Sequence, residues 1–435
     1  MNNPSPQPPP NPRTRSANAI AWRVSAMAFA GGISGGVVFP ILPALGERMG
    51  LSAFVIGVIL AANRVVRMGV NPVTGSLTDR FGGREVIAFG LFIEGLGSLG
   101  YIAALHFGAP TAWFLIGRII WGVGSSLLFV GSISAVLRVG AANERGRLVA
   151  RTRSAISSGV PGGLVLGGLL TDLINADAAF ITATALSAIG GAAALVLIPR
   201  RKHLPGEAGA RKAPAPKSGL LHDWRLILRE RRLIPIWFYT ALVFFSYGGV
   251  LMATLVLLID HRHTLVPGLN AEGTAGLLMC AMVLSYAGVS MWIGRHIDAL
   301  GRRSSTLLPG LAALVAGCGV CAFAYGLGWL IPGLVLIGAG AGGVTIPLLT
   351  LLGDLVAFER RGRATGLYQV AADTGAAAGA ILGLVLGARF GFKATYLGLG
   401  GTFLISAPLA FSLIAAERRA HPERCTIKTK EEDAR

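Results

Sequence analysis

The sequence predicts an all-α polytopic membrane protein with twelve transmembrane helices in two six-helix bundles, and three observations support this prediction. Apolar residues make up 53% of the 435 residues and charged residues only 14%, against about 25% charged in typical soluble domains. Stretches free of Asp, Glu, Lys and Arg, such as 233–259 and 394–416, reach the roughly 20 residues that cross a bilayer core. Short motifs of the first half return in the second half. Disorder, collagen, coiled coil and a soluble enzyme are excluded for the whole chain.

The apolar segments give the spans in chain order, and each is expected to be helical because unpaired backbone groups cannot be left in lipid. In the first bundle, residues 19–199, the predicted spans are 20–45, 52–74, 85–106, 111–137, 152–173 and 178–199. In the second bundle, residues 233–416, the predicted spans are 233–259, 273–294, 304–326, 329–355, 364–388 and 394–416.

Three segments lie outside the predicted bundles. Residues 1–18 contain six prolines and are predicted to be a disordered tail, and the apolar run that follows is too long for a signal-peptide core. Residues 200–232 form a basic linker that is rich in Pro, Gly and Ala and ends in a predicted amphipathic helix over 220–228, lying on the inner leaflet. Residues 417–435 are predicted to be a second charged tail.

The placement of the basic residues predicts the orientation of the chain. The two tails and the connections on their side of the membrane carry 32 of the 39 Lys and Arg residues, whereas the opposite side carries four. Basic loops stay in the cytoplasm, so both termini are expected to be cytoplasmic, in a protein of the cell inner membrane. The net charge of +18 is therefore a topology signal, and no nucleic-acid partner is expected.

The reactive side chains do not form an enzyme motif or a metal site. The sequence contains no His-Glu-x-x-His or phosphate-binding Gly-x-x-x-x-Gly-Lys segment, and its Gly-x-Ser-x-Gly match at 32–36 falls inside an apolar predicted span. Neither a membrane enzyme with catalytic residues nor an ATP-driven pump is predicted. The spacing of Cys318 and Cys321 imitates a redox or metal pair. No His or carboxylate lies near them in sequence, and small apolar filler is the favoured interpretation.

Two motifs recur at nearly the same offset. Residues 75–84 share their Gly, Asp, Gly and Arg positions with residues 294–303 at an offset of 219. Residues 145–147 and 361–363 are both Arg-Gly-Arg, at an offset of 216. Each pair falls at the same place in its half, so the halves are predicted to be parallel repeats related by an axis along the membrane normal.

The first of these repeats has a mechanical interpretation as a gate. Tight turns need the backbone freedom of glycine, and Asp79 could accept hydrogen bonds from a helix N-terminus, which carries partial positive charge. If that helix belongs to the other half, the contact forms only when the cytoplasmic side is closed. The alternative is that Arg80 and Arg84 merely hold the topology. The predicted gating residues are Gly75, Asp79, Arg80, Gly82, Arg84, Gly294, Asp298, Gly301 and Arg302.

At these residues the sequence resembles the major facilitator superfamily (MFS), and more narrowly its twelve-helix drug:proton antiporter-like branch. The resemblance covers residues 19–416, and residues 115–124 around Arg118 resemble the second motif of that branch. The third, antiporter-type motif departs from the family pattern, because Pro161 is displaced by three residues from the expected place before Gly167. The resemblance implies the MFS fold, a central cavity lined by helices 1, 4, 7 and 10, and a proton-coupling role for Arg118.

Five ionisable residues fall inside predicted spans, where a charge costs at least about 2.5–3.5 kcal/mol without a partner. They are Arg64, Arg67, Glu94, Arg118 and Asp373. Arg67, Glu94 and Asp373 lie at similar depths, roughly 12–13 Å from the cytoplasmic ends of their helices at 1.5 Å per residue.

The implied fold places helices 2 and 11 side by side, so Arg64 or Arg67 is expected to pair with Asp373 when the cytoplasmic side is shut. Protonation of Asp373 would then weaken the pair and open the gate. Two alternatives remain. Arg64, Arg67 and Glu94 could satisfy one another within the first half, and Arg118 could be a structural donor to backbone carbonyls.

A third set of residues is expected around the cavity that the resemblance implies. An aromatic wall with few charges suits a lipophilic or amphipathic solute, and a cation could use the ring faces. Packing or contact with lipid is the alternative for each ring. The candidate substrate residues are Phe29, Asn63, Trp121, Ser125, Tyr239, Phe244, Tyr247, Tyr286, Tyr368 and Gln369.

The function expected from these patterns is secondary-active transport by alternating access. The expected partners are a small-molecule substrate, protons and membrane lipid, with a proton gradient as the energy source, no bound cofactor and a monomeric state. Proton-coupled efflux of a small lipophilic or amphipathic compound or metabolite is the leading hypothesis. Uptake by proton symport or facilitated diffusion is the alternative, and a non-transporting sensor on an MFS fold is the second alternative. Substrate identity cannot be read from the sequence.

Overall fold

The computed structural model describes residues 12–139, 145–200, 230, 233–296, 303–356 and 361–420, and these residues form helices and short connections without a β-strand. The helices of the first half are α1 (Pro12–Val37), α2 (Leu42–Arg48), α3 (Ala53–Phe81), α4 (Gly83–His106), α5 (Pro110–Val139), α6 (Arg145–Leu173) and α7 (Ala176–Leu197). Those of the second half are α9 (Ile234–Val243), the π-helical η4 (Phe244–Leu251), α10 (Met252–Arg262), α11 (Ala271–His296), the 3₁₀ turn η5 (Arg303–Thr306), α12 (Leu307–Phe323), α13 (Leu327–Leu355) and α14 (Arg361–Ala420).

The described helices account for the twelve predicted spans. Eleven continuous segments are long and apolar enough to cross a membrane, and the last of them, Ala364–Ala415, has 52 residues. This segment bends at Gly391, whose φ of +79° is outside the helical range and is readily adopted only by glycine. Because each arm of the bend is long enough to span the bilayer, α14 supplies two spans and the twelve-helix fold class is confirmed.

Some element boundaries differ from the prediction. The first helix begins at Pro12, so residues 12–18, expected in the disordered tail, are helical. It ends at Val37 and is continued by the separate α2, because Pro40 and Pro43 lack the N–H groups that an unbroken helix needs. The predicted amphipathic helix over 220–228 lies outside the described residues.

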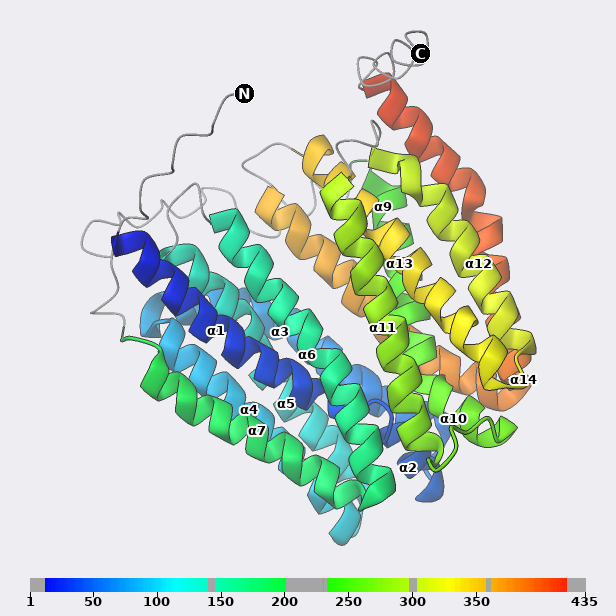
Figure 1. Cartoon of the computed structure of the whole chain (residues 1–435), viewed down its shortest axis with the longest axis horizontal. Coiled ribbons are helices and arrows are strands. Elements are labelled where there is room, and N and C mark those ends of the chain that lie inside the picture. The colour runs from blue at the N-terminus through cyan, green and yellow to red at the C-terminus, as the bar shows by residue number, and fades with distance from the viewer. Residues whose placement is uncertain are drawn as a thin grey trace, which may run out of the picture.

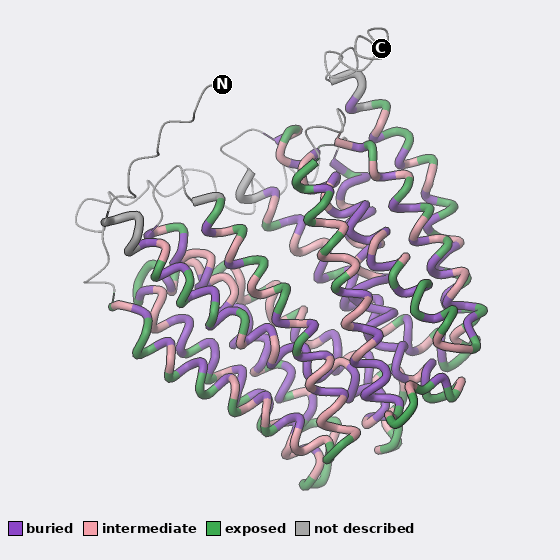
Figure 2. The backbone as a smooth tube through the Cα atoms, in the orientation of Figure 1, coloured by how far each residue is buried: buried purple, intermediate pink, exposed green. Residues whose placement is uncertain are grey.

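The two halves form separate bundles that meet at one end (Figure 1). The start of α1 and the end of α14 lie at the same end of the molecule, which we call the terminal end. From the opposite end, near α2 and α10, the bundles diverge toward the terminal end (Figure 1). Buried residues line the inner faces of each bundle (Figure 2), and the largest buried apolar cluster belongs mainly to the second half.

Close contacts between backbones join the bundles along two helix pairs, α6 with α11 and α3 with α14. A Cβ atom on Gly276 of α11 would lie 2.3 Å from the carbonyl oxygen of Leu164, and one on Gly57 of α3 would lie 2.6 Å from the Cα atom of Ile381. Small residues allow helices to approach this closely in a membrane. On α11 the buried residues are concentrated between Ala271 and Val283, and beyond them only Ile293 is buried.

Gly276→Leu is therefore expected to destabilise the protein by about 1–3 kcal/mol, because the added side chain has no space between the backbones. The measurement is the apparent melting temperature of the purified protein in detergent, which should fall by several degrees. Gly288→Leu on the same helix is the matched control, since nothing lies within 4 Å of a Cβ atom there. Equal melting temperatures for the two variants would contradict the proposed close contact.

Candidate functional site between the bundles

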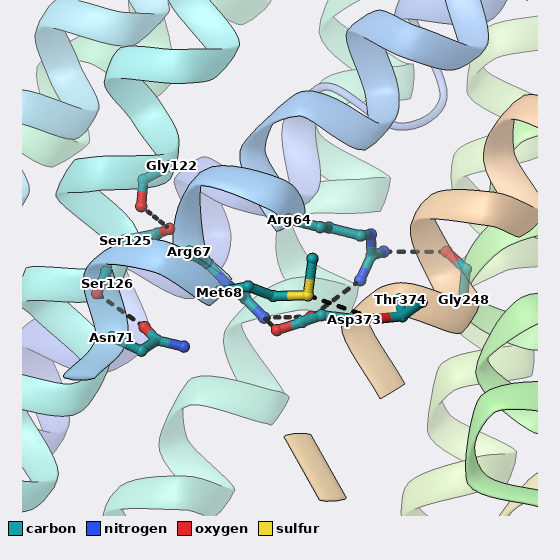
Figure 3. A network of polar contacts seen from close by, with 10 residues as sticks. All are labelled: Arg64, Arg67, Met68, Asn71, Gly122, Ser125, Ser126, Gly248, Asp373 and Thr374. Carbon is teal, nitrogen blue, oxygen red and sulfur yellow. Dashed lines mark hydrogen bonds and ion pairs between the residues drawn. The ribbon is translucent and has the colours of Figure 1, made fainter. Parts of the chain in front are cut away.

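The candidate site is centred on an ion pair that joins the two bundles (Figure 3). Nη2 of Arg67 on α3 donates to both carboxylate oxygens of Asp373 on α14, at 2.6 Å and 2.9 Å. The side chain of Asp373 is only 2% exposed and that of Arg67 is 17% exposed. Charge-assisted hydrogen bonds of this kind are about twice as strong as those between neutral groups.

A second arginine supports the same carboxylate from the preceding turn of α3. Nη2 of Arg64 donates to the carbonyl oxygen of Gly248 in η4 at 2.9 Å, and its Nη1 lies 3.7 Å from Oδ1 of Asp373. Beside this pair, Thr374 Oγ1 lies 3.4 Å from the sulfur of Met68. One helix of the first bundle thus contacts both α14 and the π-helical segment of the second.

The position of α3 is fixed within its own bundle by a small polar network (Figure 3). Ser126 Oγ on α5 donates to Oδ1 of Asn71 at 2.7 Å and lies 2.9 Å from Oγ1 of Thr74. These contacts lie one and two turns from Arg67. They tie the arginine-bearing helix to the first bundle, so the Arg67–Asp373 contact links the two bundles.

The ion pair lies near the middle of the membrane-spanning region. Arg67 is fourteen residues from both Ala53 and Phe81, the ends of α3, or about 21 Å at 1.5 Å per residue. We expected the pair in a state closed on the cytoplasmic side. In this structure the pair is formed while the bundles diverge toward the terminal end (Figure 1). At mid-depth the helices stay in contact without closure of that end.

The other two intramembrane charges lie inside the first bundle. Glu94 on α4 is fully buried, and neither of its carboxylate oxygens has a hydrogen-bond partner among the described residues. Arg118 on α5 is 1% exposed, with its guanidinium carbon 5.5 Å from the ring centre of Phe39. The alternative in which Arg64 and Arg67 pair with Glu94 is wrong for this structure, because both arginines face Asp373.

Part of the predicted aromatic wall is formed in the second bundle. The rings of Tyr247 and Tyr286 stack with centroids 5.1 Å apart. Thr345 Oγ1 donates to Tyr286 Oη at 3.4 Å, and Tyr368 Oη donates to the carbonyl oxygen of Thr345 at 3.3 Å. Tyr368 stands five residues before Asp373 on α14, so the cluster lies toward the terminal end from the ion pair.

The candidate residues of the first bundle are more scattered. Trp121 is buried with its ring against Gly35, and Ser125 Oγ donates to the carbonyl oxygen of Gly122 at 3.0 Å. Asn63 is also buried, and neither its Oδ1 nor Nε1 of Trp121 has a partner among the described residues. Phe29 of the first bundle is exposed, and Phe244 and Gln369 of the second bundle are half-buried.

The prediction for Tyr239 is wrong. Its side chain is fully buried, and its hydroxyl donates to the carbonyl oxygen of Ser406 at 2.5 Å, so it packs α9 against the last span. A cavity of about 630 Å³ lies between α9, η4 and α14 of the second bundle. Its lining is mainly apolar and includes Phe238, Phe245, Thr374 and Phe390.

The predicted gating motif is mostly helical. Gly75, Asp79 and Arg80 belong to α3, which runs on to Phe81, and only Gly82, with φ of +99°, interrupts the chain before α4. The expected loop is thus one residue long, at a backbone angle that favours glycine.

Asp79 forms an ion pair with Arg138 at the end of α5, in its own bundle, whereas we expected a helix of the other half. Arg84 is the second residue of α4, and its Nε has no partner among the described residues. Gly294 lies within α11 rather than in a turn. Three further gating candidates, Asp298, Gly301 and Arg302, lie outside the described residues.

Sequence reasoning missed a polar latch at the end opposite the termini. Oδ2 of Asp172 on α6 accepts hydrogen bonds from the backbone N–H groups of Asn270 at 2.7 Å and Gly273 at 3.0 Å. These groups begin α11, where anions are favoured. Arg48 forms an ion pair with Glu272 beside them. The sequence did hold a signal for this contact: Asp172 at the end of α6 and Glu272 at the start of α11 are acidic residues on the side that carries few basic residues.

Comparison with known proteins places this arrangement in a family. The sequence model of the family described as Major Facilitator Superfamily matches residues 24–271 and 264–431, which include both bundles. The chain is 26% identical over 377 residues to the Tetracycline resistance protein, class G, of Vibrio anguillarum, covering 85% of this chain and 88% of that protein. It is 21% identical over 271 residues to Multidrug resistance protein 2 of Bacillus subtilis. That match covers 62% of this chain and 64%, just under two thirds, of the length of the relative.

Solved structures share the fold at low sequence identity. The nucleoside transporter NupG matches with a TM-score of 0.71 and 16% identity, over 91% of this chain and 98% of that one. A bacterial homolog of the human lysosomal transporter Spinster, in an inward-facing and occupied conformation, matches with a TM-score of 0.72 and 13% identity, over 93% and 98% of the two chains.

Asp172→Ala is expected to loosen the end opposite the termini, because two backbone N–H groups of α11 lose their acceptor. The measurement is the rate at which a membrane-impermeant maleimide, added on that side, labels a cysteine placed at the buried Leu164. The rate should rise several-fold. Asp177→Ala is the matched control, since Asp177 pairs with His106 at the same end but within one bundle. A rate unchanged by Asp172→Ala would show that the latch does not hold this end closed.

Proposed function

The chain belongs to the Major Facilitator Superfamily and is a transporter rather than an enzyme, and we propose that it exports a small lipophilic or amphipathic solute in exchange for protons. The proton gradient supplies the energy. The observation that carries this proposal is the Arg67–Asp373 ion pair, because it is buried and joins the two bundles at mid-depth.

Alternating access requires the two bundles to rock about their interface, and a buried ion pair there resists that motion. Removing one partner of such a pair leaves an uncompensated buried charge, at a cost of about 3–5 kcal/mol. The protein therefore needs a replacement charge or a proton whenever the contact between Arg67 and Asp373 changes. A coupling proton meets that need, and it makes the conformational change depend on the gradient.

The charge asymmetry of the connections supports a cytoplasmic location for the terminal end. In that orientation the bundles diverge toward the cytoplasm, and the contact of Asp172 with the start of α11 closes the outer side. The arrangement corresponds to the inward-facing member of an alternating-access pair, ready to receive a solute from the cytoplasm or from the inner leaflet.

The substrate class follows from the tyrosine cluster and from the relatives. Tyr247, Tyr286 and Tyr368 form a cluster of rings and hydroxyl groups, and Gly248, the residue after Tyr247, accepts a hydrogen bond from Arg64. Such groups suit an amphipathic solute with a cationic or hydrogen-bonding group. The names of the relatives from Vibrio anguillarum and Bacillus subtilis refer to resistance to tetracycline and to multiple drugs. These names support efflux over the alternative of proton-coupled uptake.

Purified protein in liposomes with an imposed pH gradient tests the proposed function. Addition of tetracycline or a lipophilic dye cation is expected to cause proton movement opposite to the solute, measured with a pH-sensitive dye trapped inside. Proton movement in the same direction as the solute would instead establish uptake by symport. Solute movement that is independent of the pH gradient would contradict proton coupling.

The charge-swapped variant tests the role of the ion pair. Arg67→Asp and Asp373→Arg are each expected to lower the transport rate about tenfold or more, because each places two like charges at the buried contact. The double variant should recover much of the lost rate in the liposome assay. Arg389→Asp, at an exposed position on α14, is the control for a reversed charge. Full activity of both single variants would remove the ion pair from the mechanism.

A further inference from the structure

Glu94 is an ionisable group that the inter-bundle ion pair leaves without a role. Its side chain is fully buried, and neither carboxylate oxygen has a hydrogen-bond partner among the described residues. A Cβ atom on Gly31 of α1 would lie 3.0 Å from Oε2 of Glu94, and one on Gly124 of α5 would lie 2.9 Å from its Cγ. The carboxyl group is therefore enclosed by close-packed helices, where an unpaired negative charge is costly.

Few charged groups surround this carboxyl. Residues 24–37 of α1 and residues 178–197 of α7 contain no ionisable side chain. On α5 the nearer charged group along the helix is Arg118, about two turns from Gly124, while Arg138 lies at the far end. On α4 itself Tyr101 lies two turns from Glu94, and Arg84, Glu85 and His106 lie in the first and last turns. On α3 the positive charge of Arg67 acts on Glu94. The positive charge of Arg67 therefore interacts with both carboxyl groups, those of Glu94 and Asp373.

At the depth of the ion pair, the arginine side chains outnumber the carboxylates that they contact. Two guanidinium groups, those of Arg64 and Arg67, share the single carboxylate of Asp373, while Glu94 lies unpaired in its own bundle. If Arg67 moved from Asp373 to Glu94, each arginine would have one carboxylate, because Arg64 already lies 3.7 Å from Asp373. That second arrangement requires Glu94 to be ionised.

We propose that Glu94 carries the coupled proton and that Arg67 changes partner from Asp373 to Glu94 when the bundles rock. In the arrangement described here Glu94 is a neutral carboxylic acid. As Arg67 approaches, the O–H bond of Glu94 breaks, one proton leaves to water, and the carboxylate accepts the guanidinium N–H groups. Asp373 stays ionised throughout and keeps Arg64. This inference rests on the proposed proton coupling and assigns the proton to a residue other than Asp373.

Infrared difference spectroscopy tests the protonation of Glu94 without any transport assay. Purified protein should show the C=O stretching band of a buried, protonated carboxylic acid. Glu94→Gln should lose the band and Glu94→Asp should shift it, whereas Asp373→Asn and the exposed control Lys393→Gln should retain it. The glutamine side chain is nearly isosteric, and an unchanged melting temperature checks its folding. A band that persists in Glu94→Gln, or its absence from the unmodified protein, would overturn the assignment.

Proton release then tests the exchange of partners. In weakly buffered detergent solution with a pH indicator, tetracycline or the lipophilic dye cation that moves in liposomes is expected to release about one proton per protein, and Arg67→Gln should abolish this release while keeping the infrared band. Release that survives Arg67→Gln would refute the exchange. A protein with the Glu94 band but without solute-dependent proton flux in liposomes would contradict the proposed function and leave the assigned proton site standing, so the two failures are distinguishable.

Discussion

Charges in the middle of a membrane must be paired, and the architecture of this transporter depends on how that requirement is met at Asp373. The carboxylate belongs to one bundle, and both guanidinium groups that face it belong to the other. The pairing therefore exists only while α3 and α14 lie against each other at mid-depth. The glycine contacts along α3 and α11 allow the helices to approach, and the polar ties of α3 to α5 hold the arginines in place.

The two ends of the molecule differ in how they are held. At the end opposite the termini, Asp172 binds the start of α11, Arg48 pairs with Glu272, and backbones meet at glycine. Toward the terminal end the bundles diverge (Figure 1). The ion pair lies at the boundary between these regions. The π-helical η4 adds a backbone carbonyl at the same boundary, consistent with the frequent use of such segments at functional sites.

Hydropathy, charge placement and depth are one-dimensional properties, so they could be predicted from the sequence. They gave the twelve spans, and they placed Arg67 and Asp373 at matching depths. The rotation of a helix about its axis depends on its neighbours, which is why Tyr239 packs toward Ser406 instead of a central cavity. Partners across the bundle interface, such as Asp172 with Gly273, and the continuation of α3 to Phe81 likewise depend on tertiary packing.

The central claim is that Arg67 and Asp373 interact directly across the two bundles, and a double-mutant cycle measures this most directly. The apparent melting temperatures of the unmodified protein, Arg67→Gln, Asp373→Asn and the double variant would be compared in one detergent. Interacting residues are expected to show a coupling energy of about 0.5–3 kcal/mol, so the double variant should lose much less stability than the sum of the single variants. Strictly additive losses would contradict the claim.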